Sequence, residues 1–353
     1  MPGSDARPLP VQDLEHILEH TEALWQDLRG ARLFVTGGTA FFGRWMLESF
    51  LKANDDLGLG AEATVLTRDP ARFAAAAPHV AEHAAVTLHR GDVKSFEFPT
   101  SDCSHVLHMA TEAGPGMSQR ASFQTATAGT ERVLAYAALR GSHKLLLTSS
   151  GAVYGKQPPD CDRLSEEYAG APQPEDANAG YSFGKRAAES LCLAVAAESG
   201  VEVKIARCFA FVGPLLPLDQ DYAIGNFFGD ALDRDHIEIK GDGTARRSYL
   251  YASDLAIWLW TILVRGESGR PYNVGSEQDL SIAELAGKVA GAVRPGIPVR
   301  IAQTPTGAAP SRYIPSTARA KGELGLQAHV MLDEAVRRTA QWHRDGPAPA
   351  GAG

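Results

Sequence analysis

The sequence predicts an α/β fold, with a doubly wound parallel sheet followed by a smaller C-terminal lobe of mixed helices and strands. Between residues 31 and 210, short aliphatic and β-branched runs alternate with longer segments of helical apolar spacing. That alternation indicates parallel strands joined by crossover helices. The strands are continuously apolar, as burial on both faces of a parallel sheet requires. The 353-residue length favours two lobes over one.

The individual elements follow from the apolar spacing in chain order. The first is a capping helix over residues 11–29, with apolar residues near helical spacing at Leu14, Ile17, Leu18, Leu24 and Leu28. Strands are predicted at residues 31–38, 63–68, 86–92, 104–110, 144–150 and 201–210. Helices between these strands are predicted at residues 41–53, 123–140 and 181–199.

Composition and charge exclude several classes of protein. The chain carries 34 Lys and Arg against 42 Asp and Glu, a net charge of −8, which argues against a nucleic-acid binder. No apolar run approaches the roughly 20 residues of a membrane-spanning helix, and no secretory signal is visible at the N-terminus. The four cysteines are far apart and lack a C-x-x-C pair. We therefore expect no disulfide framework, no metal site and a cytoplasmic location.

A glycine-spaced turn separates the first strand from its helix. Thr36 opens the string TGGTAFFG, in which Gly37 serves the tight turn and Gly43 allows close packing of helix on strand. Such a turn aims backbone N–H groups and a helix N-terminus at a pyrophosphate. The sequence therefore predicts a Rossmann-type dinucleotide site. Its expected cofactor contacts are Gly37, Thr39, Ala40, Phe41, Phe42 and Gly43.

The ends of later strands indicate where the rest of the cofactor lies. An acidic residue after the second strand would bind the ribose of NAD, but this chain has Thr67 and Arg68 there. Arg68 suits a 2′-phosphate and favours NADP over NAD, although a solvated surface arginine would look the same. Further contacts are expected beside the adenine at Asp92 and Val93, and near the nicotinamide at Met109, Ala110 and Thr111.

The sequence predicts four parts of the chain around the cofactor turn. We expect an N-terminal extension with its capping helix at 1–30, a dinucleotide-binding domain at 31–210, a mainly substrate-binding lobe at 211–345 and a disordered tail at 346–353. Segments around 245–275 are expected to return from the lobe to the core.

A candidate catalytic trio follows the fifth strand. Tyr181 and Lys185 are spaced i, i+4 and share one helix face, while Ser150 ends the preceding strand beside Ser149. The carboxyl ends of parallel strands meet at one crevice, so these side chains are expected together. An ammonium near a phenol favours the phenolate, which can take a proton from a sugar hydroxyl as hydride leaves the same carbon.

Residues 31–325 resemble the extended short-chain dehydrogenases/reductases, specifically the NAD-dependent epimerase/dehydratase group acting on nucleotide sugars. The matching strings, in the family's order, are TGGTAFFG, LHRGDV, SSGAVYG, YSFGK, RCFAFVGP, RRSYLYASDL and YNVGS. The resemblance implies that Ser150, Tyr181 and Lys185 are catalytic, that Ser149 contacts the cofactor and that Arg247 grips the substrate diphosphate. It also implies structural roles for Asp254, Asn273 and Ser276.

Departures from the family pattern bear on the reaction. Family dehydratases carry Asp-Glu, and decarboxylases a Glu, where this chain has Gly151-Ala152. Two apolar residues cannot move protons, so elimination of water by that route is not expected. Ala210 and Ala126 replace frequent asparagines, and Glu112 is a candidate substitute acid/base on another wall of the site, although a surface glutamate is the commoner case.

Several functions remain open at this stage. The first is an NAD(P)-dependent nucleotide-sugar 4-epimerase acting through a transient 4-keto sugar. The alternatives are an NADPH-dependent 4-keto-sugar reductase, a dehydratase using Glu112 and a non-enzymatic dinucleotide sensor. A homodimer with a four-helix interface is also expected, because the helices at 123–140 and 181–199 carry more apolar residues than one sheet face needs. Those residues are Val133, Leu134, Tyr136, Leu139, Leu191, Leu193 and Val195.

Overall fold

The fold is built on a doubly wound parallel sheet, as the sequence predicted, and the sheet has seven strands. The computed structural model describes residues 6–111, 118–220 and 222–346. The strand order is β11-β6-β5-β4-β1-β2-β3. The strands are β1 (Arg32–Thr36), β2 (Glu62–Thr67), β3 (Val86–Arg90), β4 (His105–His108), β5 (Lys144–Ser150), β6 (Glu202–Cys208) and β11 (Pro271–Val274).

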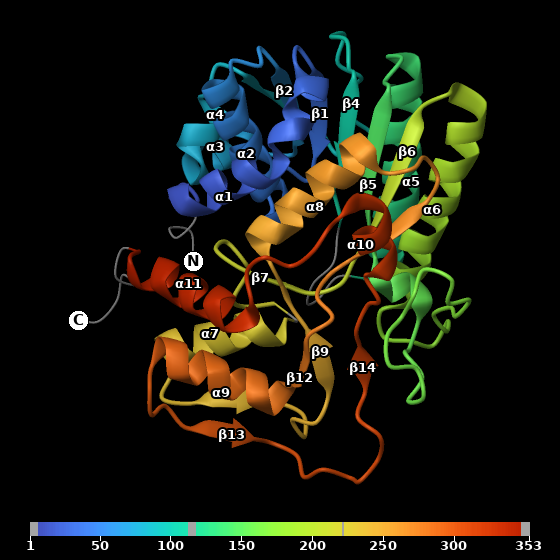
Figure 1. The fold of residues 1–353 in the computed structure, drawn as a ribbon. Coiled ribbons are helices and arrows are strands. Elements are labelled where there is room, and N and C mark those ends of the chain that lie inside the picture. Colours follow the sequence, from blue (N-terminus) through green and yellow to red (C-terminus); the bar gives the residue numbers. More distant parts are fainter. Residues whose placement is uncertain (1–5, 112–117, 221, 347–353) are drawn as a thin grey trace.

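Helices cover both faces of this sheet (Figure 1). One face carries α1 (Val11–Thr21), α2 (Phe41–Leu57) and α8 (Ala252–Arg265), packed around Trp25, Trp45 and Trp260. The other face carries α5 (Gln119–Leu139) and α6 (Ala179–Ser199), which lie side by side over Phe34 and Tyr136. Two short helices, α3 (Pro70–Ala76) and α4 (Pro78–Ala81), fill the connection from β2 to β3.

Two expectations from the sequence differ in detail from the structure. The helix expected over 11–29 ends at Thr21, and a 3₁₀ turn over Glu22–Leu28 lets Leu24, Trp25 and Leu28 reach the core. The apolar excess on the α5–α6 pair is smaller than expected, because Val133, Leu134 and Tyr136 belong to the core under α5. Leu191 and Val195 are partly buried against that core, while Leu139 and Leu193 remain exposed.

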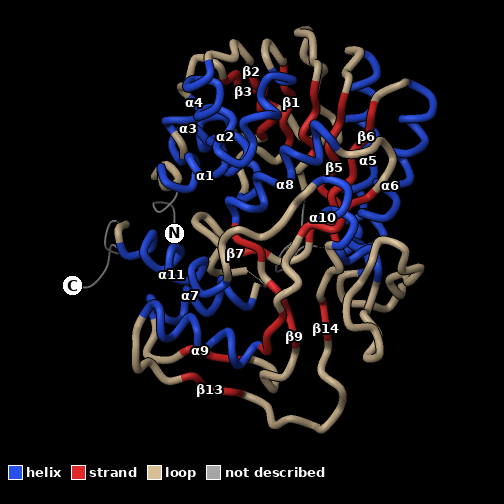
Figure 2. Tube along the Cα trace, viewed as in Figure 1, coloured by secondary structure: helices blue, strands red, loops and turns tan. Residues whose placement is uncertain are grey.

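The C-terminal lobe lies below the sheet edge in the view of Figure 2 and is held by short strands. Its strand β9 (Arg246–Ser248) pairs with β12 (Asp279–Ser281) and β14 (Arg312–Tyr313), and β8 (Ile237–Ile239) pairs with β13 (Val299–Ile301). Two short strands, β7 (Phe211–Val212) and β10 (Leu250–Tyr251), join the lobes. Its helices are α7 (Ala223–Asp233), α9 (Ile282–Val293) and α11 (Leu332–Arg344), whereas α10 (Ala318–Leu324) packs against β11 and α8 of the sheet domain.

The N-terminal helix is tied to the end of the chain by one buried carboxylate. Asp13 of α1 is fully buried, and its oxygens accept hydrogen bonds from the Tyr251 hydroxyl and the Arg338 guanidinium, both at 2.7 Å. Because a buried charge is costly unless it is paired, this trio fixes α1 against β10 and α11. Among the helices that the structure describes, none is long and apolar enough to span a lipid bilayer.

Candidate active site

The turn between β1 and α2 has the shape of a phosphate cradle. Gly37 has φ +73°, and a Cβ there would lie 2.6 Å from the backbone of Met109 and Ala110. At Gly43 a Cβ would lie 2.3 Å from the Gly37 carbonyl oxygen, so helix and turn touch directly. The first turn of α2 has no side-chain cap, and the neighbouring Thr39 and Ala40 are exposed. This arrangement fits a pyrophosphate held by backbone N–H groups.

The end of β2 carries the residues expected at the ribose of the cofactor. Thr67 is nearly buried at the end of β2, and its hydroxyl accepts the N–H of Asp69 at 3.3 Å. Asp69 in turn caps α3 by accepting the N–H of Arg72 at 3.0 Å, whereas Arg68 is exposed. Asp92 accepts the N–H of Lys94 at 2.9 Å.

The other residues expected at the cofactor follow β3 and β4 or begin α2. Val93 packs close to Gly129, because a Cβ on that glycine would lie 3.0 Å from its methyl group. Met109 and Ala110 follow β4 against the glycine turn, and the Thr36 hydroxyl accepts the N–H of Ala110 at 3.2 Å. Phe41 and Phe42 are partly exposed at the start of α2, and Thr111 is exposed.

The three expected catalytic side chains meet at the carboxyl end of β5. The Ser150 side chain lies near the Tyr181 phenol and lowers its pKa against the larger effect of burial, and the Ser150 oxygen accepts the N–H of Ala152 at 3.1 Å. The Lys185 ammonium lies 5.9 Å from the centre of the Tyr181 ring and donates to the Thr148 carbonyl at 2.8 Å. The strand end and one face of α6 therefore converge as the sequence predicted.

Burial shifts the pKa values of Tyr181 and Lys185, the two titratable members of the trio. It raises the pKa of Tyr181 to about 12, against the lowering effect of Ser150. It lowers the pKa of Lys185 to about 8. Behind them, burial lowers the pKa of His108 to about 3, so this ring is neutral between the hydroxyls of Thr36 and Thr130. Shifted phenol and ammonium groups in one crevice are typical of a proton-transfer site.

A second phenol lies near Ser150 and comes from the C-terminal lobe, although no local pattern in the sequence predicts it. Burial raises the pKa of the Tyr313 phenol of β14, and Ser150 opposes that rise. The Tyr313 ring lies 4.7 Å from the ring of Phe209. A Cβ on Gly151 would lie 2.6 Å from the Tyr313 hydroxyl and 2.7 Å from Phe209. The absence of a side chain at Gly151 therefore makes room for these two rings.

Arg247 lies next to Tyr313, because the two residues are register partners of β9 and β14. Its guanidinium donates to the carbonyl of Arg246 at 2.8 Å and to that of Ser311 at 3.2 Å. Within the described part of the chain, no ion pair joins Arg247 to a carboxylate, and burial lowers its pKa. A half-buried cation beside the trio suits an anionic group of the substrate.

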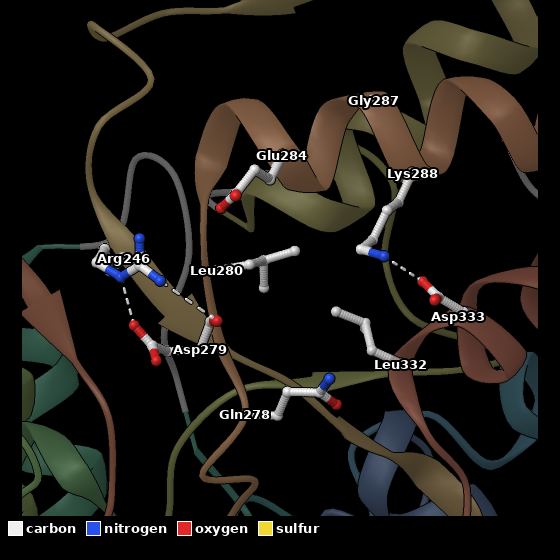
Figure 3. A pocket seen from close by; sticks show the side chains of 9 residues that line it. All are labelled: Arg246, Gln278, Asp279, Leu280, Glu284, Gly287, Lys288, Leu332 and Asp333. Carbon is white, nitrogen blue, oxygen red and sulfur yellow. Dashed lines mark hydrogen bonds and ion pairs between the residues drawn. The ribbon is translucent and has the colours of Figure 1, made fainter.

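The neighbouring Arg246 faces a different space, since successive side chains alternate along a strand. It lines a hollow of about 530 Å³ in the C-terminal lobe (Figure 3). Four of the charged side chains in this hollow form ion pairs, Arg246 with Asp279 and Lys288 with Asp333, while the Glu284 side chain caps its own helix. None of the catalytic trio lines it, so we place the chemistry at Ser150 and not here.

The remaining expected residues have mostly supporting positions. The Ser149 hydroxyl donates to Glu189, which pairs with Arg207. Asn273 accepts the Tyr154 hydroxyl at 2.7 Å, and Asp254 accepts the N–H groups of residues 329 and 330. The Ser276 hydroxyl accepts the N–H of residue 278. Ala210 and Ala126 stand where the family often has asparagine. Ala210 is partly buried, and Ala126 lies against Gly184 of α6. Glu112 lies outside the described residues.

With this geometry in view, comparison with known proteins decides the family. The profile of the NAD dependent epimerase/dehydratase family matches residues 33–275. The chain belongs to this family. It is therefore an enzyme of the NAD-dependent nucleotide-sugar epimerase, dehydratase and decarboxylase class.

Two relatives of this epimerase/dehydratase chain are both named UDP-glucuronic acid decarboxylases. The chain is 29% identical over 316 residues to UDP-glucuronic acid decarboxylase 1 of Xenopus tropicalis, covering 89% of this chain and 72% of the relative. It is 30% identical over 238 residues to UDP-glucuronic acid decarboxylase 5 of Arabidopsis thaliana, covering 67% and 68%.

Solved structures of other family members have the same fold. An epimerase of Methanothermobacter thermautotrophicus superposes with a TM-score of 0.77 at 23% identity, covering 93% of this chain and 96% of that one. A dTDP-glucose 4,6-dehydratase of Streptomyces venezuelae with NAD bound has a TM-score of 0.74 at 23% identity, covering 89% and 97%. At these identities the likeness concerns the fold alone.

Proposed function

We propose that this protein is a nucleotide-diphosphate-sugar 4-epimerase that works through a transient 4-keto sugar. The observation that carries the proposal is the environment of Ser150. Its side chain meets the phenols of Tyr181 and Tyr313, while the next two positions are Gly151 and Ala152. The site thus has the groups that oxidise and reduce an alcohol, but lacks at these positions a carboxylate for elimination.

Each residue of the trio has a defined task in this reaction. When bound, the nicotinamide cofactor supplies the hydride acceptor for oxidation at C4 and the hydride for the later reduction. Ser150 orients the C4 hydroxyl, and Tyr181 removes its proton and later returns it. Lys185, as an ammonium, favours the phenolate of Tyr181 and so opposes the effect of burial on its pKa. The C4 epimer would form if the ketone turned its other face to the bound cofactor before Tyr181 returned the proton.

Arg247 would anchor the substrate during this cycle. Guanidinium binds phosphate oxygens through two parallel hydrogen bonds, and Arg247 lies beside Tyr313 at the same crevice. We also propose that Arg68 favours NADP over NAD, because it is exposed at the end of β2 and no acid occupies position 67. A homodimer is proposed through the exposed apolar residues of α5 and α6.

A second candidate activity is decarboxylation of a nucleotide-linked uronic acid, which the names of the relatives favour. Oxidation at C4 by the same trio would give a β-keto acid, which loses CO₂ without a protein base. A proton must then reach C5, and the Glu that family decarboxylases keep is Ala152 here. We rank this activity second for that reason.

The proposed function is tested by incubating the pure protein and NAD(P) with UDP-, dTDP-, GDP- and CDP-sugars and with UDP-glucuronic acid. Proton NMR would follow the sugar, and absorbance would follow NADPH. Epimerisation gives a C4 epimer without net absorbance change. Tyr181→Phe should lower turnover by roughly 100-fold or more while cofactor binding persists.

Each alternative gives a different result in the same assay. Net consumption of NADPH identifies a 4-keto-sugar reductase, for which a 4-keto substrate must be added. Release of CO₂ identifies the decarboxylase. Cofactor binding with no turnover of any sugar identifies a sensor. A Tyr181→Phe variant with a near-normal rate contradicts the catalytic assignment.

A further inference from the structure

Two histidines and a glutamate lie on the N-terminal helix, away from the residues that the reaction uses, and a third histidine packs against them. His16 and His20 lie one turn apart on α1, with Glu19 between them. The ligand atoms of these three residues all lie within 4.8 Å of one another. His329, from the loop before α11, adds a third imidazole, with its ring centre 4.0 Å from that of His20 and 5.6 Å from that of His16.

A buried carboxylate beneath the cluster is left with one unused oxygen. Asp254 at the start of α8 is fully buried, and its Oδ2 accepts the N–H groups of His329 at 3.0 Å and Val330 at 2.9 Å. This holds the His329 loop against α1. Its Oδ1 lies 3.8 Å from Nε2 of His16, and within the described residues neither atom has a hydrogen-bond partner. Buried polar atoms without partners are rare and call for an explanation.

We propose that His16, Glu19, His20 and His329 form a binding site for a divalent transition-metal ion of the zinc type. Three imidazoles and one carboxylate make a four-ligand set that zinc accepts in tetrahedral geometry, at about 2.0–2.2 Å from each ligand atom. The ligand atoms of His16, Glu19 and His20 lie within 4.8 Å of one another and must move closer to bind an ion, and the side chains of Glu19 and His20 are exposed.

The surroundings orient the ligands as metal sites require. Nδ1 of His20 lies 2.9 Å from the carbonyl of His16, so as N–H it donates there and leaves Nε2 as the ligand atom. Asp254 Oδ1 is placed to accept Nε2–H of His16 once its Nδ1 holds the ion. A carboxylate behind a ligating histidine fixes the ring and raises its basicity. The two unsatisfied buried atoms then become partners of each other.

The ion would join segments that are distant along the chain. Two of the imidazoles belong to the N-terminal helix, the third to the approach to the last helix, and the supporting carboxylate to α8. Binding to the folded state alone stabilises it by an amount that grows with the logarithm of the ligand concentration relative to the dissociation constant. The site is therefore structural and independent of the proposed epimerase activity.

The test uses the full-length chain without a polyhistidine tag, stripped with a chelator and then titrated with Co²⁺ and Zn²⁺. We expect one equivalent of Co²⁺ to give the visible absorption of tetrahedral coordination, and Zn²⁺ to raise the thermal midpoint. His20→Gln and His329→Gln should each lower the affinity by at least about 10-fold. His236→Gln is the matched control, because this histidine pairs with Asp235 in the other lobe.

His329→Gln decides the proposal, since only the fold brings this residue to α1. Wild-type protein without stoichiometric binding, or a His329→Gln variant that binds as wild type does, overturns the site. An equal loss in His236→Gln also overturns it. Circular dichroism of the stripped variants shows whether each folds. If His329→Gln does not fold, Glu19→Gln, altered at an exposed side chain, carries the test: an unchanged affinity overturns the four-ligand site.

Discussion

The hydroxyl of Tyr313 occupies the space where a side chain on Gly151 would begin. A Cβ built on Gly151 would lie 2.6 Å from that oxygen, closer than real contacts allow. Tyr313 comes from the C-terminal lobe and Gly151 from the end of β5, so the two lobes meet at this point. A side chain at position 151 and the Tyr313 hydroxyl in its observed place therefore exclude each other.

Gly151→Ala should destabilise the protein and slow its reaction. The added methyl group must displace either the Tyr313 hydroxyl or the Phe209 ring, and overpacking of this kind costs about 1–3 kcal/mol. Urea unfolding followed by circular dichroism measures the change. Gly287→Ala is the matched control: this glycine lies in α9 with nothing within 4 Å of an added Cβ, and alanine there should stabilise the helix slightly. Equal stability of Gly151→Ala and wild type would contradict the packing described.

The buried Lys185 should make the free energy of unfolding depend on pH. Burial lowers its pKa in the folded protein to about 8 from 10.5. Between these values the unfolded chain binds the proton and the folded protein does not. Stability therefore rises with pH across this window, and the contribution of the charged, buried lysine is unfavourable below about pH 8.

Lys185→Met removes this titration while keeping an unbranched side chain. The stability of wild type minus that of Lys185→Met should increase by about 1–3 kcal/mol between pH 7 and pH 10. Urea titrations at several pH values measure it, and groups common to both proteins cancel in the difference. A difference that is flat or falls with rising pH would show that Lys185 keeps its proton throughout.

Local spacing in the sequence was enough to predict the sheet and the closeness of Tyr181 and Lys185, whose catalytic role stays a prediction. The turn around Gly37 and Gly43 and the Tyr181–Lys185 pair lie within single short segments, so period and backbone geometry determine their positions. Ser150 could be added because parallel strands end at one edge. Arg247 was assigned through resemblance, and the structure places it beside that edge.

Contacts between distant segments could not be predicted in this way. Nothing near Tyr313 in the sequence indicates that it reaches Ser150, because the contact depends on how β14 pairs with β9. The His16–Glu19–His20 spacing can be read from the sequence, but these three residues alone did not predict a metal site, and we expected none. Its fourth member, His329, joins only through the Asp254 contacts across the fold. Contacts that depend on the pairing register of short strands in the C-terminal lobe therefore cannot be predicted from local sequence.

Arg68→Ala should change the cofactor preference. A charge-assisted contact with a 2′-phosphate would be lost, so NADP affinity should fall relative to NAD by about 1.5–3 kcal/mol. Titration of both cofactors by fluorescence or calorimetry gives the ratio. Arg72→Ala is a nearby control, because its backbone N–H, not its side chain, caps α3. If both affinities stay unchanged in Arg68→Ala, the preference for NADP has no basis at this residue.

Introducing charged residues on the exposed surface of α5 and α6 should prevent dimerisation. Phe123, Leu139 and Leu193 are 40%, 64% and 45% exposed on these adjoining helices. Leu139→Glu with Leu193→Glu should therefore shift a dimer to a monomer in light scattering at micromolar concentration. Ile301→Glu is the control, since this residue is 50% exposed on β13 in the other lobe. A wild-type protein that is already monomeric refutes the predicted interface.

The last prediction concerns the proton at C5 of the sugar. Eliminating water from a 4-keto intermediate requires a base within about 3 Å of that proton. Gly151 and Ala152 offer none, and burial raises the pKa of the neighbouring Cys208 thiol to about 12, so it stays protonated. Incubation with dTDP-glucose or UDP-glucose should therefore yield no 4-keto-6-deoxy product, which is detected by its absorbance in alkali. If the product does form, the epimerase proposal fails, and loss of the signal in Glu112→Gln would then identify Glu112 as the base.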